Sequence, residues 1–227
     1  ELHLDVIMHR VREEFGIDLQ VGKPQVVYKE SIEGTLTREH TFEKVINNTL
    51  CKGWVSITVA PNTRGEGNFI ISRVGEDNPV YPFVNAAEEG VSEAFNIGVL
   101  KGYPLTDVRV EINDATFNNP EFARLTLKMA AYDALRDACQ QAGPVLLVPI
   151  MSLTVTVPNE FLGEIIADLN SRKCHIANIM TKDKYTIVDA NAPLTNMFGY
   201  STDIRSLSQG RASFTMYFSR YDRIENG

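Results

Sequence analysis

The sequence predicts an α+β protein with two folded units in a row, and three observations lead to this prediction. Strand-like runs alternate along the 227 residues with segments whose apolar residues have helical spacing. A long helical pattern stops at Gly143-Pro144, and a second series of strands and helices follows directly. Hydrophobic residues make up 44% of the chain, which is enough for a separate core in each unit.

Residues 1–23 are expected to be the end of a preceding domain. Their apolar side chains recur at helical spacing up to Phe15, Gly16 is the expected C-cap, and the run Ile17–Val21 alternates as a half-buried strand does. The sequence lacks an initiator Met and its helical pattern is already under way at Glu1, so we expect a fragment of a longer protein. Charges throughout this segment exclude a signal peptide.

Residues 24–143 are expected to form the first unit, from strands and two long helices. The strands are predicted at Gln25–Glu30, Thr35–Val45, Val55–Ala60, Asn68–Ser72 and Leu105–Asn113. The helices are predicted over Pro82–Asn96 and Pro120–Gln141, each with an apolar stripe on one side. A proline in the first turn suits a helix, because the N–H that it lacks would have no partner there.

Residues 144–227 are expected to form the second unit. Its predicted elements are a strand at Val145–Val157, a helix at Pro158–Ser171, strands at Cys174–Met180 and Tyr185–Ala192, a short helix that begins near Asn191–Pro193, another turn or two at Tyr200–Leu207, and a strand at Ala212–Phe218. The order β-α-β-β-α-β is that of the split βαβ, or ferredoxin-like, fold.

Charge and composition exclude several classes of protein. A net charge of -7 argues against a broad affinity for nucleic acid, so any RNA contact must be local. The three cysteines Cys51, Cys139 and Cys174 are far apart, which indicates free thiols in a reducing cytoplasm and neither a disulfide framework nor a zinc site. The four histidines are equally scattered, and no apolar run is long enough to cross a membrane.

Motifs of catalysis are missing from the sequence, and we therefore expect the chain to be no enzyme by itself. It contains neither of the glycine-rich phosphate-binding patterns, and Gly65-Glu66-Gly67 is better explained as a turn between strands. The carboxylate pairs Glu88 and Glu89, and Asp133 and Asp137, fall on polar helix faces, where solvated charge is the ordinary explanation.

Three strings carry a resemblance to a known family. They are GVLKGYP at residues 98–104, AGPVLLVPIM at 142–151 and FGYSTDIRSLSQGRASF at 198–214. Together they resemble the C-terminal part of the elongation factor G family, and the resemblance covers essentially the whole chain. It implies that residues 1–23 end domain III. Residues 24–143 would form domain IV, an arm of the βαβ type of ribosomal protein S5 domain 2, and residues 144–227 the ferredoxin-like domain V.

The resemblance also implies where contacts with RNA lie. The tip of the arm is built from two loops, which here correspond to residues 45–55 and 113–119. Asn47 and Asn48 stand where the family has a pair of glycines, and Asn118 stands at the position of a histidine; asparagine tolerates positive φ but carries no charge. The expected tip contacts are Asn47, Asn48, Thr49, Lys52, Asn118 and Asn119. The expected ribosome-facing cations of domain V are Arg172, Lys173, Arg205 and Arg211, although Arg205 and Arg211 could instead brace the short helix against the sheet.

The function implied is that of the ribosome-binding part of a GTP-dependent translocase. The P-loop, with GTP and Mg, would lie before Glu1, and this fragment itself would hold no cofactor. The expected partners are rRNA, tRNA, mRNA and ribosomal proteins, with the protein a monomer in the cytoplasm and not at a membrane. Three alternatives stay open: a paralogue for ribosome recycling, a ribosome-protection factor that displaces an antibiotic, and a stand-alone ligand-sensing module.

Overall fold

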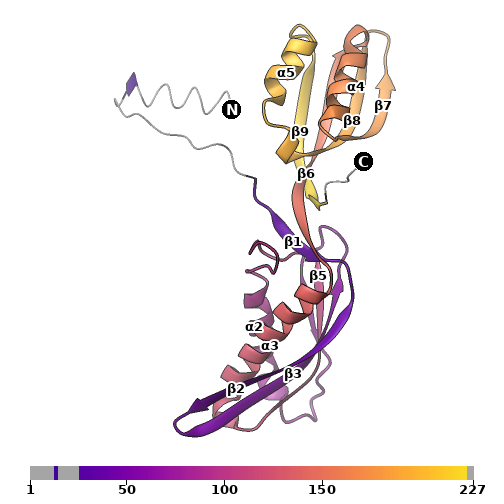
Figure 1. Ribbon diagram of the computed structural model, residues 1–227. Helices are drawn as coiled ribbons and strands as arrows, with labels where there is room; N and C mark the ends of the chain where they lie inside the picture. Colours follow the sequence, from indigo (N-terminus) through magenta and orange to yellow (C-terminus); the bar gives the residue numbers. More distant parts are fainter. Residues whose placement is uncertain (1–12, 15–25, 224–227) are drawn as a thin grey trace.

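The computed structural model describes residues 13–14 and 26–223, in two units stacked end to end (Figure 1). The helix and strand expected in residues 1–23 therefore fall outside the described residues, apart from Glu13 and Glu14, which are helical. Both units combine a sheet with helices, so the predicted α+β class is confirmed.

The first unit contains a four-stranded sheet with two helices packed on it. Its strands β2 (Leu36–Ile46), β3 (Thr49–Pro61), β4 (Phe69–Ser72) and β5 (Val108–Phe117) lie in the order β2-β3-β5-β4, with β4 parallel to β5 and the other pairs antiparallel. The helix α3 (Ala123–Gln141) lies over the sheet, and α2 (Val84–Ala94) packs beside it. Apolar residues of both helices and of the strands share one core.

Two glycines allow α3 to lie close to its neighbours, one on α2 and one on β3. A Cβ at Gly90 in α2 would lie 2.1 Å from the carbonyl oxygen of Lys128 in α3. A Cβ at Gly53 in β3 would lie 2.5 Å from the carbonyl carbon of Thr126, also in α3. Because neither neighbour is a flexible side-chain end, both positions require glycine.

The second unit has the predicted split βαβ order. Its elements are β6 (Pro144–Pro158), α4 (Leu162–Ser171), β7 (His175–Thr181), β8 (Tyr185–Pro193), α5 (Tyr200–Leu207) and β9 (Ser213–Asp222). The strands pair antiparallel in the order β9-β6-β8-β7. Side chains of α4 and α5 pack with those of the strands in a second core, separate from the first.

The strand β6 runs through the junction of the two units (Figure 1). Its first residues, Pro144 to Leu147, pair with β1 (Lys29–Ile32), whose Ile32 belongs to the core of the first unit. From Ile150 onward β6 pairs with β8 in the second unit. An ion pair of 2.6 Å between Glu33, just after β1, and Arg223, just after β9, adds a second link.

The ends of several elements differ from the sequence-based predictions. The strand β3 begins at Thr49 and not at Val55, and β5 continues to Phe117 and not to Asn113, so most of both expected tip loops is paired strand. The pairing is continuous because β2 and β3 stay in register from Leu36–Val59 to Ile46–Thr49. The short helix expected to begin near 191–193 is a single 3-10 turn at Leu194–Asn196, because β8 continues to Pro193.

Candidate functional site

The free end of the β2–β3 hairpin is the first candidate site. Asn47 and Asn48 connect the strands with φ of 49° and 61°. Positive φ at both central residues is the requirement of a type I′ turn, whose twist matches that of the flanking strands. Since Ile46 pairs directly with Thr49, the strands stay paired up to the turn, and the tip is a narrow projection.

The outermost part of this hairpin is uncharged. Val45 and Leu50 lie opposite each other and are 64% and 45% exposed, and Asn47, Asn48 and Thr49 are exposed as well. Lys52 lies one step back, where its Nζ forms an ion pair of 2.6 Å with Glu43 on the facing strand. The positive charge of Lys52 is therefore partly neutralised within the chain.

Asn118 joins the second tip segment to the hairpin. Its side-chain oxygen accepts a hydrogen bond of 2.7 Å from the Lys52 backbone N–H, and its amide nitrogen donates one of 2.8 Å to the Leu50 carbonyl. Asn119 accepts a bond of 3.0 Å from the Glu121 N–H and so caps a 3-10 turn. Both side chains thus have structural partners, and the geometry places Asn118 behind the turn and not at its apex.

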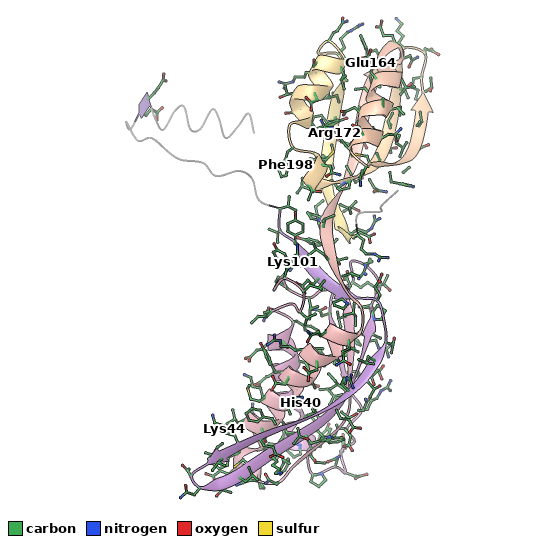
Figure 2. All side chains as sticks on the ribbon, in the orientation of Figure 1. His40, Lys44, Lys101, Glu164, Arg172 and Phe198 are labelled. Carbon is green, nitrogen blue, oxygen red and sulfur yellow. The ribbon has the colours of Figure 1, made fainter. Side chains whose placement is uncertain are left out.

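A histidine that sequence reasoning had not singled out lies farther back along the hairpin (Figure 2). His40 in β2 has its Nε2 3.7 Å from an oxygen of Asp133 and its Nδ1 3.3 Å from an oxygen of Asp137, both in α3. The two aspartates follow each other at the i, i+4 spacing of one helix face. That spacing can be read from the sequence, but the sequence does not show that His40, on a strand far away in the chain, lies against the two aspartates.

Arg172 holds together the helix side of the second unit (Figure 2). Its guanidinium pairs with Asp168 at 2.9 Å and with Asp203, donates a hydrogen bond of 2.8 Å to the carbonyl of Asn196, and lies 5.2 Å from the centre of the Tyr200 ring. Burial by itself lowers the pKa of this guanidinium, but the bonds to Asp168 and Asp203 outweigh it and raise the pKa. These contacts occupy the side chain, so its geometry favours a bracing role.

The other three cations of the second unit differ in their freedom to meet a ligand. Arg211 pairs with Glu160 at 2.7 Å and lies 4.5 Å from the centre of the Phe161 ring, which ties it to the segment before α4. Arg205 is exposed on α5, and its side chain has no ion pair among the described residues. Lys173 is also exposed, follows α4 with a φ of 57°, and lines a cleft near the junction.

The three cysteines are free and buried. Burial raises the pKa of the Cys139 thiol to about 12 and that of Cys174 to about 11. Within residues 13–14 and 26–223, no three His, Cys, Asp or Glu side chains gather as metal ligands would. The described helices also include none that is long and apolar enough to span a membrane.

Comparisons with known proteins agree on one family. A family model described as elongation factor G, domain IV, matches residues 24–143, and one described as elongation factor G C-terminus matches residues 145–227. The elongation factor G of Aquifex pyrophilus is 40% identical over 224 residues, which are 99% of this chain and 32% of that relative. A crystal structure of a Thermus thermophilus protein superposes with a TM-score of 0.86 at 26% identity, over 100% of this chain and 34% of the other. The chain thus spans about a third of the length of both.

Proposed function

Because the chain belongs to the elongation factor G family, we propose that it is the ribosome-binding C-terminal part of a translational GTPase. In this proposal residues 24–143 are an arm whose tip enters the decoding site and accompanies tRNA and mRNA during translocation. Residues 144–227 are the base that contacts the large subunit. GTP and Mg bind in a domain before Glu1, and the partners are rRNA, tRNA, mRNA and ribosomal proteins of the cytoplasm.

The shape of the hairpin is the observation that carries this proposal. The β2–β3 pair reaches the end of the molecule farthest from the second unit and closes there through two residues (Figure 1). The β2–β3 pairing bonds the backbone groups that face each other up to the turn, so the projection keeps its shape, while the outer edge of β2 leaves backbone N–H and C=O groups open to a partner. Such a projection suits a mechanical role, in which the tip fills a space on the ribosome and prevents reverse movement.

Chemistry and movement then belong to different parts of the protein. Hydrolysis of GTP takes place in the GTPase domain, while this chain supplies shape and binding. Of the four cations expected to contact phosphate, Lys173 and Arg205 have exposed side chains without an ion pair in the described structure, so they support the contact best. Arginine and lysine bind phosphate through charge-assisted hydrogen bonds, which salt weakens.

Shortening the hairpin tests this function. Removing Val45, Ile46, Thr49 and Leu50 from the full-length factor makes each strand two residues shorter, or about 7 Å, while keeping the turn and the alternation of faces. We expect normal co-sedimentation with ribosomes and normal GTP hydrolysis, but slower single-round translocation. The control Asn48→Gly retains the length and a favoured I′ sequence. Unchanged translocation in the shortened factor would refute the proposed role of the tip.

A role in ribosome recycling or protection is the second candidate, and it is supported by the uncharged side chains at the tip. Residues 45–50, which include the two asparagines of the turn, carry no charged side chain. The side-chain amide of Asn118 is also uncharged, and it is hydrogen-bonded to the backbone of Leu50 and Lys52 in β3. Full-length factor with Asn118→His should be compared with the unmodified factor in translocation and in subunit splitting. Faster translocation in the variant, with slower splitting, would favour recycling, whereas equal rates mean that the position is silent.

A further inference from the structure

A cleft lies in the second unit, close to the junction and away from the hairpin tip. Four segments line it: Ile150 of β6, Lys173 and His175 at the start of β7, Asn191 and Pro193 at the end of β8, and Arg220, Asp222 and Arg223 at the end of β9. The register of the sheet brings these segments together, since His175 pairs with Asn191 and Arg220 pairs with Ile150 of β6. The cleft is thus held by backbone pairing and not by a loop.

The charges that face this cleft are mostly positive. Lys173, Arg220 and Arg223 contribute three cations, and Asp222 is the one acid among the described lining residues. Arg220 uses its Nε in a bond of 3.0 Å to Asp222, and Arg223 uses one terminal nitrogen in its bond to Glu33. A guanidinium has five N–H donors in a rigid fork, so these ion pairs fix both arginines and leave donors for a further acceptor. The Lys173 ammonium has no ion pair among the described residues.

The size of the cleft limits what can occupy it. Its volume is about 190 Å³. Sites for drug-sized molecules occupy about 300–1,000 Å³, and a water molecule takes about 30 Å³. The cleft therefore has space for one small anion with part of an attached sugar, and the remainder of a larger ligand would lie outside it.

From the fork donors, the excess positive charge and this size, we infer that the cleft is a binding site for one phosphate group. Lys173 and Arg220 are its main ligands, with Arg223, His175 and the Asn191 amide as further donors. A phosphodiester of an RNA strand and a free phosphate share this chemistry. Phosphate binding in the cleft is a property of the 227-residue chain alone and does not depend on translocation.

Titration of the chain with inorganic phosphate tests the site. Backbone amide signals of His175 and Asn191 should shift and saturate in NMR spectra as phosphate replaces chloride at constant ionic strength. The double variant Lys173→Gln with Arg220→Gln should bind at least about tenfold more weakly, because it loses two charge-assisted contacts. The matched control is Lys182→Gln with Lys184→Gln, which removes the same charge from the exposed β7–β8 turn at the other end of the strands. It should bind within about twofold of the unmodified chain.

Two outcomes would overturn the site. One is a set of shifts that never saturates, or that chloride reproduces; the other is equal weakening in both double variants. Unchanged signals elsewhere in the Lys173→Gln with Arg220→Gln variant establish that it is folded. A short single-stranded RNA that displaces phosphate identifies a phosphodiester as the ligand, and phosphate binding without competition by RNA identifies a free phosphate. Because no ribosome is used, a negative result here would leave the hairpin experiment unaffected.

Discussion

One buried carboxylate organises the loop between α2 and β5 in the first unit. Glu30 in β1 is fully buried, and its two oxygens accept hydrogen bonds of 2.8, 2.8 and 3.0 Å from the backbone N–H groups of Leu100, Lys101 and Tyr103. These residues belong to the string GVLKGYP. A Cβ at Gly98 would lie 2.2 Å from a Glu30 oxygen, which explains the glycine at that position.

Replacing this carboxylate should destabilise the chain strongly. Glu30→Gln keeps the size of the side chain but puts N–H donors against N–H donors, so we expect a loss of about 2–4 kcal/mol in the free energy of unfolding. Urea denaturation measures this loss. The control Glu66→Gln removes an exposed carboxylate without a side-chain partner among the described residues, and it should change stability by less than about 0.5 kcal/mol. Equal effects of the two changes would show that the Glu30 bonds contribute little.

The buried thiols predict a loss of stability in alkali. The pKa of Cys174 rises from 9.0 to about 11, and that of Cys139 to about 12, mainly through burial. Between pH 9 and 11 the unfolded chain releases thiol protons that the folded chain retains, so stability is full below pH 9 and falls as the pH rises. Urea midpoints measured at pH 8 and at pH 10.5 should show this fall, and Cys174→Ala should reduce it. A fall of the same size in the Cys174→Ala variant would show that the Cys174 thiol does not cause the loss of stability.

At the scale of elements, the contact between α2 and α3 depends on Gly90. A Cβ there would meet the Lys128 carbonyl at 2.1 Å, so Gly90→Ala should force the helices apart and cost about 1–3 kcal/mol. The control Gly163→Ala lies in α4, where an added Cβ meets nothing within 4 Å, and it should stabilise by about 0.4–1 kcal/mol. Thermal unfolding followed by circular dichroism measures both changes. A change in stability of the same sign in both variants would contradict this account of the packing.

The sequence predicted which elements exist much better than where they end. Apolar periodicity located every described helix of three turns or more, because that signal is local. The start of β3 and the end of β5 were missed because strand pairing depends on partners far away in the chain. Asn118 and Arg172 illustrate the same limit: their types suggested RNA contacts, while their partners at Leu50 and Asp203 become visible only in the fold. The cleft at Lys173 was likewise not predictable, since four segments assemble it.

At the scale of the whole molecule, one strand sets the position of the arm relative to its base. Val148-Pro149 lies between the residues of β6 that pair with β1 and those that pair with β8, and its partners there are Tyr221 and Asp222 near the end of β9. Replacing both by glycine should loosen the junction, because glycine gives the backbone more freedom. Spin labels at Asn48→Cys and Ser206→Cys should then show a broader distribution of distances, and the three native thiols, which are buried, should remain unlabelled.

The control for this experiment places the same two glycines inside the second sheet. Ser152 and Thr156 of β6 have paired neighbours on β8 and on β9. Glycine at these positions should leave the width of the distance distribution unchanged. If the distance distributions of the junction variant and of this control are equally narrow, contacts between the units, and not the continuity of β6, maintain their orientation.

The pairing of β6 with β1 at one end and with β8 and β9 farther along also restricts how the gene can change. Adding or deleting one codon within this strand would turn every following side chain to the opposite face, in the ladder with β1 or in those with β8 and β9. The turns at Asn47-Asn48 and Lys182-Asp183 carry no such constraint, because each belongs to one hairpin only. Changes of length, and affinity tags or fluorescent reporters inserted by design, should therefore leave the fold intact in these turns and disrupt it along the shared strand, although at Asn47-Asn48 they would alter the tip that the proposed function requires.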